Sequence, residues 1–537
     1  MKTIAFHNLG CKVNSYELDV MQQIMREKGY EIVPFDKKAD VYVINTCTVT
    51  NIADRKSRQM LHRAKQKNPD AVVVAVGCYV QTDLAGATAD PAIDLAIGNN
   101  RKKDIAEILE RYLAEREINR DAADGGEPGE ICGKAESSEI SAVADKTLGG
   151  ETVLDIAHEK EYEEMQLKTT AEHTRAYIKI QDGCNQFCSY CAIPLARGRV
   201  RSRKQEDILK EIRGIVDAGY LEIVLTGIHV SSYGIDFEKA DGNAKGADSA
   251  KNGGIATLSQ GTSPDAGGKS AGGEKENGAM DYRGVTMLFD LIEEIHKIPG
   301  LQRIRISSLE PRIVTPETAK RLAALPKVCP HFHLSLQSGC DATLKRMNRH
   351  YTAQQYSESV EALRNAYAPR IPAITTDVIA GFPGETEEEF AETKTFLEKV
   401  GFYEMHVFKY SKRKGTRAAV MDGQVPEPVK AQRSDVLLEL ERKQSMEFRN
   451  RKLGQIVEVL MEEEKVIGGK NYLLGHTTDY VRVALPLPGD GAKVRPGAGT
   501  DAPETAGKKA RAGEIMRLEL LEFLTEDILL GRETDLF

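Results

Sequence analysis

The 537-residue chain has no run of 18 apolar residues, so we expect no segment to span a membrane. Residues 1–7 lead from a short apolar stretch directly into polar sequence, which is not the pattern of a signal peptide. Cysteines are few, nine in all, and several stand beside basic residues, which favours a reducing compartment over a disulfide framework. These absences predict a cytoplasmic protein with no membrane anchor.

The chain also lacks the basic excess that is common in nucleic-acid-binding proteins, because its formal net charge is −8. The acidic residues are concentrated, however: residues 121–172 hold 14 Asp and Glu against 4 Lys and Arg, and the rest of the chain carries +2. Local patches matter more than the total charge, so an RNA partner is not excluded. The length indicates about three domains.

One cysteine cluster lacks the fourth ligand that a closed metal site would need. Cys184, Cys188 and Cys191 are spaced C-x3-C-x2-C, and no further cysteine follows before Cys329. Cubane iron–sulfur clusters usually take four thiolates, so three leave one iron without a protein ligand. A structural zinc site would need a fourth Cys or His close by, and the next candidate, His229, lies well downstream. The spacing therefore predicts a cluster with an open coordination position, where chemistry can occur.

Three more cysteines follow short apolar segments in residues 1–117, where strand and helix patterns alternate. Expected strands at residues 4–6, 41–44 and 72–76 lead to Cys11, Cys47 and Cys78, respectively. Ligands of open parallel sheets bind at the carboxyl ends of the strands, so these thiols could converge. A single such cysteine is more typical of a small buried hydrophobe. Its repetition at three equivalent strand ends predicts a second three-thiolate site.

The predicted fold class is a multidomain α/β protein. Residues 1–117 form an open parallel α/β domain, and six strand–helix units predict a partial (β/α)6 barrel within residues 173–426. Short alternating strands in residues 451–525 predict a small antiparallel β-barrel, a fold that often binds nucleic acids. We expect an acidic linker at 118–172, a connecting helix at 427–450, and two flexible insertions, one at 241–280, where ten of 40 residues are Gly, and one at 487–512, which is rich in Gly, Pro and Ala.

Two cysteine triads on two α/β modules, followed by a small β-barrel, resemble the radical S-adenosylmethionine (SAM) methylthiotransferases. Residues 6–15 (Phe-His-Asn-Leu-Gly-Cys-Lys-Val-Asn-Ser), 45–50 and 196–203 resemble the branch that modifies N6-threonylcarbamoyladenosine (t6A) at position 37 of tRNA, 3′ of the anticodon. Two other branches modify isopentenyladenosine in tRNA or an aspartate of a ribosomal protein, and these are the alternatives. A more remote alternative is a non-catalytic protein that binds zinc and RNA.

The resemblance implies two 4Fe-4S clusters, one on each triad, with SAM as the further cofactor. In the family, the cluster of the C-x3-C-x2-C motif donates an electron to SAM, and the resulting 5′-deoxyadenosyl radical removes the hydrogen from C2 of adenine. The second cluster supplies the sulfur. The implied product is 2-methylthio-N6-threonylcarbamoyladenosine, the implied partners are tRNA carrying t6A and an electron donor such as flavodoxin or ferredoxin, and the C-terminal barrel is implied to be a TRAM-like RNA-binding module.

The resemblance also suggests residues that contact SAM, although Gly, Ser and Pro are common in turns at strand ends anyway. The expected contacts are Tyr190, Gly227, Ser307, Glu310, Gln337 and Asp377. No catalytic side chain is expected beyond the cluster ligands. Four arginines at alternate positions, Arg197, Arg199, Arg201 and Arg203, would place one positive row along an extended segment. We expect this row to contact tRNA phosphates, and a solvated charged face is the alternative.

Overall fold

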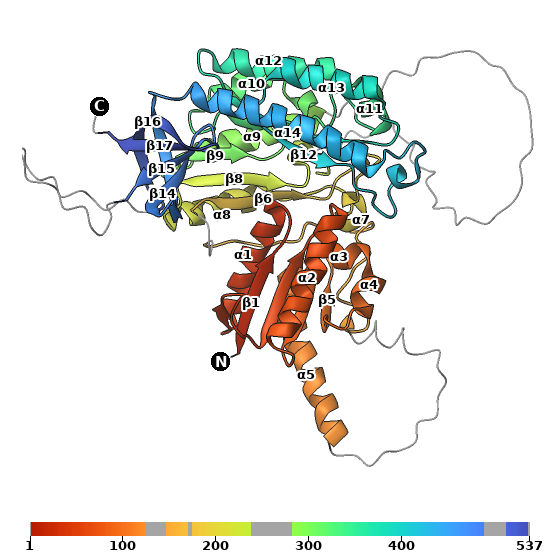
Figure 1. Cartoon of the computed structure of the whole chain (residues 1–537). Helices are drawn as coiled ribbons and strands as arrows, with labels where there is room; N and C mark the ends of the chain where they lie inside the picture. Colours follow the sequence, from red (N-terminus) through yellow and green to blue (C-terminus); the bar gives the residue numbers. More distant parts are fainter. Residues whose placement is uncertain (1, 125–145, 170–173, 238–281, 488–511, 535–537) are drawn as a thin grey trace, which may run out of the picture.

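The computed structural model describes residues 2–124, 146–169, 174–237, 282–487 and 512–534 (Figure 1). The expected insertion at 241–280 lies outside the described residues, as do most of the expected insertion at 487–512 and residues 125–145 of the expected linker. In the described part of the chain, no helix has the length and apolar character needed to cross a membrane. The eight cysteines of this part are all free.

The N-terminal domain is a five-stranded parallel sheet in the order β2-β1-β3-β4-β5. Its strands are β1 (Thr3–Asn8), β2 (Glu31–Val33), β3 (Val41–Thr46), β4 (Val72–Gly77) and β5 (Leu95–Ile97). Its helices are α1 (Lys12–Glu27), α2 (Asn51–Lys67), α3 (Cys78–Thr82), α4 (Leu84–Ala89), η1 (Lys102–Asp104) and α5 (Ile105–Asp124). Every residue of β3 and β4 is buried, as expected for strands that are covered on both faces.

The central domain is an open barrel of six parallel strands, as predicted. The first three are β6 (Ala176–Asp182), β8 (Glu222–Gly227) and β9 (Arg303–Ile306), and the last three are β10 (His331–His333), β11 (Ala373–Ala380) and β12 (Glu404–Lys409). Parallel bridges from Ile304 to Val328 and from Leu309 to Leu334 connect the two sets. The short strand β7 (Arg201–Ser202) pairs antiparallel with β6 at the edge.

Helices and short 3-10 turns connect the strands of this open barrel. They are α7 (Ile193–Arg197), α8 (Gln205–Asp217), η2 (Val230–Ser232), α9 (Tyr282–His296), η3 (Pro311–Ile313), α10 (Pro316–Ala323), α11 (Asp341–Arg346), α12 (Ala353–Tyr367), α13 (Glu387–Val400) and η4 (Arg417–Val420). Several begin with a hydroxyl side chain that caps the first turn, and Thr315, Thr352 and Thr386 each form a capping box.

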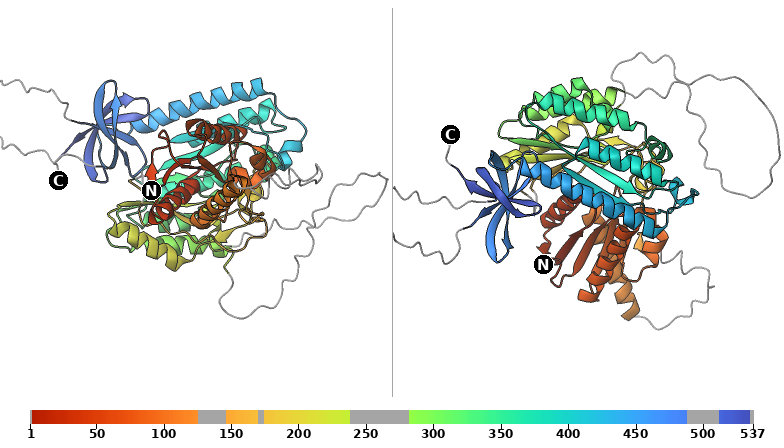
Figure 2. Two further views of the ribbon diagram at one scale, coloured as in Figure 1. Left: turned by 90° about the horizontal axis from the view of Figure 1, so that it is seen from below. Right: turned by 45° about the horizontal axis from the view of Figure 1, so that its top comes forward.

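The long helix α14 (Glu427–Asn450) runs along the central domain to a closed five-stranded barrel (Figure 2). The strands are β13 (Ile456–Ile467), β14 (Lys470–Thr477), β15 (Arg482–Pro486), β16 (Ile515–Thr525) and β17 (Ile528–Glu533), in the order β13-β14-β15-β17-β16. All neighbours are antiparallel except β15 and β17, which are parallel.

Part of the expected linker is packed into the protein. Leu148, Met165 and Leu167 are buried in the core that the N-terminal and central domains share. The Tyr16 hydroxyl of α1 donates a hydrogen bond to the Met165 carbonyl at 2.6 Å. Residues 146–169 therefore pack against the two domains through a few buried apolar side chains, which the acidic composition concealed.

The carboxyl ends of the N-terminal strands face the central domain. Figure 1 shows the N-terminal sheet rising from the start of the chain towards β6, with α1 directly beneath that strand. Helix α1 contacts β6, and α3 contacts α7. This arrangement brings the loops that follow β1, β3 and β4 against the loop that follows β6.

Candidate functional site

The structure brings the three N-terminal cysteines to one edge of one sheet. Cys11 follows β1, Cys47 follows β3 and Cys78 begins the helix after β4, and these three strands are neighbours in the sheet. Cys47 and Cys78 are buried, and Cys11 is exposed. A convergent set of three thiols is thus formed from residues that are far apart in the sequence.

Tight backbone turns bring these thiols together. Gly10 has a φ of +115°, and a Cβ at this position would lie 3.2 Å from the Cys47 Sγ. A side chain would therefore be strained and would crowd the thiol. Desolvation and the nearby Cys78 together raise the pKa of Cys47 to about 12, against the opposing effect of Arg197. Because metal ligation requires thiolates, metal binding at this site would release protons.

The second triad lies in the loop that leaves β6. Gly183 opens this loop with a φ of +69°, and a Cβ there would lie 1.7 Å from the Arg199 carbonyl oxygen, so only glycine fits. The Gln186 backbone amide donates to the Cys184 Sγ at 3.5 Å. Arg349 donates from Nη1 to the Cys188 Sγ at 3.2 Å. The loop thus presents three thiols with hydrogen-bond donors already directed at two of them.

The spacing of the sulfur atoms fits an iron–sulfur cluster better than a single zinc ion. Among the described residues, neither triad has all three sulfur atoms within 4.8 Å of one another. Tetrahedral zinc, with Zn–S bonds of about 2.3 Å, would require sulfur–sulfur separations of roughly 4 Å. A four-iron cluster places its thiolates on different irons and therefore spreads them further apart. The wider spacing therefore argues against one zinc ion in either triad, and the assignment of a cluster to each triad stays a prediction.

Four of the expected SAM contacts lie in the loop of the second triad or at the carboxyl ends of β8 and β9. Tyr190 lies between two of its cysteines, and its ring packs edge-on against Phe382. Gly227 ends β8, and a Cβ there would lie 2.9 Å from the Gln181 Oε1, so the backbone is closely approached. The Ser307 Oγ is buried and has no hydrogen-bond partner within the described part of the chain. A buried hydroxyl without a partner at the carboxyl end of β9 could be satisfied by a bound polar ligand.

Glu310 is a buried carboxylate of this site with a lowered pKa. It is 5% exposed and lies 3.4 Å from the His229 Nε2. Desolvation raises its pKa, but the hydrogen bond and charge of His229, with the charges of Arg312 and Arg349, outweigh this and lower the pKa to about 2. Glu310 is therefore a carboxylate at neutral pH that can accept hydrogen bonds from a ligand amine or hydroxyl.

The last two expected contacts lie on adjacent strands of the barrel. Gln337 has a φ of +74° and bridges to Val378 of β11. Asp377 pairs with the His333 Nε2 at 3.5 Å. His333, Asp377 and His406 place one ligand atom each within 4.8 Å of one another, which is also the ligand set of a mononuclear metal site. Asp377 is thus held by β10 and β12 within the barrel.

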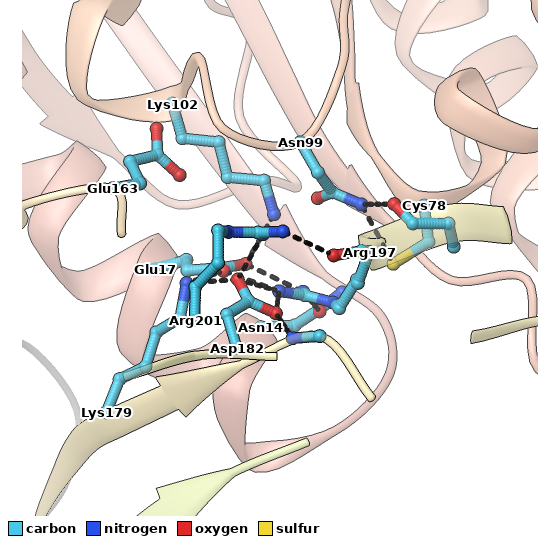
Figure 3. A network of polar contacts seen from close by, with 12 residues as sticks. Asn14, Glu17, Cys78, Asn99, Lys102, Glu163, Lys179, Asp182, Arg197 and Arg201 are labelled. Atoms are coloured by element: carbon cyan, nitrogen blue, oxygen red, sulfur yellow. Dashed lines mark hydrogen bonds and ion pairs between the residues drawn. The ribbon is translucent and has the colours of Figure 1, made fainter. Parts of the chain in front are cut away.

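A buried ionic network lies between α1 of the N-terminal domain and β6 of the central domain (Figure 3). Glu17 of α1 accepts hydrogen bonds from Lys179 at 2.7 Å, from Arg197 at 2.7 and 2.9 Å, and from Lys102. Asp182 of β6 pairs with Lys179 at 2.7 Å, with Arg197 at 3.1 Å and with Arg201 at 3.9 Å. All six side chains are at most 5% exposed. The network therefore fastens the N-terminal domain to the central domain.

The end of α7 contacts residues beside two of the three N-terminal cysteines, Cys11 and Cys78. Arg197 donates to the Asn14 Oδ1 at 2.6 Å, and Cys11 donates from Sγ to the same oxygen at 3.7 Å. The Asn99 amide donates to the Cys78 Sγ at 3.5 Å and to the Ala196 carbonyl at 2.7 Å. The segment that follows the second triad thus fixes the position of the first.

The prediction of a phosphate-binding arginine row is wrong for three of its four members. Arg197, Arg201 and Arg203 are at most 2% exposed, and they pair with Glu17, Asp182 and Glu211. Their carboxylate partners come from α1 of the N-terminal domain and from β6 and α8 of the central domain, so these arginines face the interior and not a surface. Arg199 alone is exposed, and its guanidinium lies 4.4 Å from the centroid of the exposed Phe187 ring.

The sequence did not reveal which side chains the buried charged residues would pair with. Lys179 interrupts an apolar strand and Glu17 lies among buried positions of an amphipathic helix, and each is a charged residue at a core position. This pattern could have suggested a buried ion pair, but the partners are distant in the sequence. Arg349, which contacts Cys188, stands in no distinctive motif.

The comparisons with known proteins agree with this geometry. Residues 178–397 match the Radical SAM superfamily, and residues 3–98 match a family described as Uncharacterized protein family UPF0004. The threonylcarbamoyladenosine tRNA methylthiotransferase MtaB of Bacillus subtilis is 37% identical over 90% of this chain and 90% of its own length. The protein of the same name from Aquifex aeolicus is 35% identical over 88% and 95%, respectively.

Two further matches are more distant. A tRNA-2-methylthio-N(6)-dimethylallyladenosine synthase of Carboxydothermus hydrogenoformans is 32% identical over 84% of this chain and 86% of its own length. Among solved structures, the radical S-adenosylmethionine methyltransferase TsrM of Kitasatospora setae, with cobalamin and a [4Fe-4S] cluster bound, superposes with a TM-score of 0.50 at 16% identity. This match covers 78% of this chain and 77% of that one, and it shows a shared fold.

Proposed function

The chain belongs to the radical SAM tRNA methylthiotransferases, and we propose that it converts t6A in tRNA to 2-methylthio-N6-threonylcarbamoyladenosine. The observation that carries this proposal is the meeting of Cys11, Cys47 and Cys78 at one sheet edge, which is fastened by α7 to the Cys184 loop. Two sites of three thiols each suit a reaction that needs one centre for SAM and another for sulfur. The relatives named for t6A reach 37% identity, against 32% for those named for dimethylallyladenosine, which favours t6A as the substrate.

Each triad would hold one 4Fe-4S cluster, and Tyr190, Gly227, Ser307, Glu310, Gln337 and Asp377 would contact SAM. When bound, these groups supply the one-electron chemistry and the sulfur that replace the C2 hydrogen of adenine with a methylthio group. The chain itself orients and shields the groups. Arg349 donates to the Cys188 Sγ, and the buried network around Glu17 holds the two centres at a fixed separation.

We assign residues 1–117 and 173–426 to the chemistry, and residues 451–525, as a TRAM-like barrel, to tRNA binding. Arg199 and Phe187 form an exposed cation–aromatic pair beside the cluster loop, which suits stacking against an RNA base or pairing with a phosphate. Reduction of the cluster would require a small electron carrier of the flavodoxin or ferredoxin class. We place the reaction in the cytoplasm, where tRNA and such carriers occur.

The test is an anaerobic reaction of the reconstituted protein with SAM, a reductant and tRNA that carries t6A. Mass spectrometry of the digested nucleosides should show the methylthio product. A parallel reaction with tRNA that carries isopentenyladenosine should show none. Product only in the second reaction would replace the proposed substrate with the alternative.

Iron analysis tests the two centres independently of turnover. The reconstituted protein should hold about eight irons per chain, and replacement of Cys184, Cys188 and Cys191 by Ala should leave about four. Replacement of Cys11, Cys47 and Cys78 should also leave about four. About four irons in the unaltered protein would contradict the sulfur-donating centre. Zinc in place of iron would contradict the chemistry altogether.

A further inference from the structure

Helix α2 presents a positively charged face that begins next to the first triad. It holds six Lys and Arg residues and a single carboxylate, Asp54, in a chain whose acidic residues outnumber the basic ones by 81 to 73. Its buried residues are Ser57, Leu61 and Ala64. Its exposed cations are Arg55, Lys56, Arg58 and Arg63. Since Asp54 is half-buried, the outer face of α2 is cationic and carries no carboxylate.

The carboxylates near α2 do not neutralise these cations. Asp54 pairs with Arg413 at 2.6 Å, and other carboxylates pair with cations elsewhere on the helix, Asp90 with His62 and Asp94 with Lys65. Within the described part of the chain, Arg55, Lys56 and Arg63 form no ion pair and no side-chain hydrogen bond. Like charges at neighbouring helical positions repel one another, so an anion from outside the chain would stabilise this face.

A loop of the central domain extends the cationic face. The Asn51 backbone amide donates to the Ser411 Oγ at 3.1 Å, and the Asn51 side chain donates to the Lys412 carbonyl at 3.1 Å. The buried Arg413 of this loop holds Asp54. Residues 411–417 therefore lie against the start of α2, and their exposed cations are Lys412, Lys414 and Arg417. These three cations and the four of α2 are called the basic strip below.

The same loop also contacts the segments around the second triad. Arg417 donates from Nη2 to the Phe187 carbonyl at 3.0 Å, and a Cβ at Gly415 would lie 3.0 Å from the Leu195 Cδ1. The Phe187 ring lies 4.4 Å from the Arg199 guanidinium, and both side chains are exposed. The basic strip thus connects α2 with an exposed cation–aromatic pair in the neighbourhood of the second triad.

The length and direction of the basic strip fit a nucleic-acid strand. Helix α2 has 17 residues and is about 25 Å long, and Arg55 and Arg63 lie about 12 Å apart along its axis. Figure 1 shows α2 running from the level of α7 along the N-terminal sheet towards α5. Phosphates repeat along an RNA strand, so a row of exposed cations can contact several of them. The Phe187–Arg199 pair suits a base, since bases stack on aromatic rings.

An acidic electron carrier is a second kind of partner that positive charge would attract. Under the proposed function, such a carrier reduces the cluster of the second triad. Helix α2, however, begins at Asn51, shortly after Cys47 of the first triad, and extends away from the central domain. The placement of four of the seven cations on this helix therefore favours RNA over the carrier.

We propose that the basic strip binds the phosphate backbone of the tRNA anticodon arm and thereby directs the nucleotide 3′ of the anticodon to the two triads. This inference rests on the proposed function and adds a tRNA contact outside residues 451–525. Phosphate contacts fix the register of a bound strand without reading its sequence. The basic strip therefore contributes affinity and orientation, and recognition of the modified base lies elsewhere.

The experiment measures the Kd of a t6A anticodon stem-loop RNA at several salt concentrations, with the cluster-loaded full chain in the absence of SAM. Wild type is compared with the triple variant Arg55→Gln/Lys56→Gln/Arg63→Gln. The control is a second triple variant, Lys210→Gln/Lys320→Gln/Lys399→Gln, which removes the same charge from exposed positions in α8, α10 and α13. Iron content and circular dichroism verify that each variant is intact.

Each lost phosphate contact lowers the steepness of log K against log salt by about 0.7–0.9. The α2 triple variant should therefore lower it by about 2 and raise the Kd by roughly 10- to 100-fold at low salt. The control should keep the wild-type Kd within about twofold and the wild-type salt dependence. A charge-preserving variant, Arg55→Lys/Arg63→Lys, should bind nearly as tightly as wild type, because a phosphate accepts either cation.

Three results would overturn the proposal. Unchanged RNA binding by the α2 triple variant would show that the basic strip does not contact the RNA. Equal weakening by the α2 and control variants would show that only the total charge matters. Slower cluster reduction by an acidic flavodoxin, with RNA binding unchanged, would assign the basic strip to the electron carrier.

The same proteins separate this inference from the proposed function. If the wild type converts the t6A stem-loop and the α2 triple variant binds it as wild type does, only the role of the basic strip fails. If the wild type forms no methylthio product on any t6A RNA, the proposed function itself fails, whatever the binding measurements give.

Discussion

Removal of the Glu17 carboxylate should separate the N-terminal domain from the barrel, whereas removal of Arg197 should do less harm. The buried network contains four cations, Lys102, Lys179, Arg197 and Arg201, and two carboxylates, Glu17 and Asp182. The six side chains together carry +2. Glu17→Gln raises this to +3, and Arg197→Met lowers it to +1.

The expected loss of stability depends on which charged side chains each variant leaves without a partner. In Glu17→Gln, Lys102 loses its only carboxylate of the network, and Lys179 and Arg197 each lose one of two. Loss of one partner of a buried ion pair costs about 3–5 kcal/mol. In Arg197→Met, Glu17 keeps both lysines and Asp182 keeps Lys179, so we expect a cost of about 1–3 kcal/mol from the lost hydrogen bonds.

Hydrogen exchange of the backbone amides in α1 and β6 measures how often this interface opens. It is preferable to a global unfolding curve, because a multidomain chain does not unfold in one two-state transition. Glu17→Gln should speed exchange in both elements much more than Arg197→Met. Glu164→Gln provides the control, because its carboxylate is half exposed and near Arg203, and such surface pairs contribute at most about 1 kcal/mol. If Arg197→Met opens the interface more than Glu17→Gln, or if Glu17→Gln matches the control, the charge argument is refuted.

Three further predictions concern other contacts. Arg349→Met should lower 5′-deoxyadenosine formation by about 10- to 100-fold, because a hydrogen bond to the Cys188 Sγ is lost, and unchanged formation per iron would contradict this. Arg413→Ala removes the ion pair with Asp54 at 2.6 Å and should lower the free energy of local opening of the loop before η4 by about 2 kcal/mol. Faster hydrogen exchange at the start of α2 would reveal this opening. Glu310→Gln should destabilise the cluster-free protein by roughly 3 kcal/mol at neutral pH. The folded pKa of Glu310, about 2, lies below its ordinary value of 4.5. The difference in unfolding free energy between wild type and Glu310→Gln should therefore be complete above pH 4.5 and shrink as the pH falls towards 2. A pH-independent difference in denaturant melts would show that the charge of Glu310 is not responsible.

Much of the fold was predictable because apolar segments and their turns are local features. The three central strands of the N-terminal sheet and the six strands of the barrel were expected near their observed places. The edge strands β2 and β5 were not, since three residues each are too few to show a period. The packed role of residues 146–169 was also missed, because an acidic composition says little about the few apolar side chains that find partners.

The sequence by itself determined the two cysteine triads, because one is a local spacing and the other follows from equivalent strand ends. It also determined the charge of each arginine in residues 197–203, but not which way that charge would face. Only the tertiary structure decided that Arg197, Arg201 and Arg203 meet carboxylates in the interior. The physical reason is that a buried charge depends on its partners for its stability, and those partners come from α1, β6 and α8, which only folding brings together.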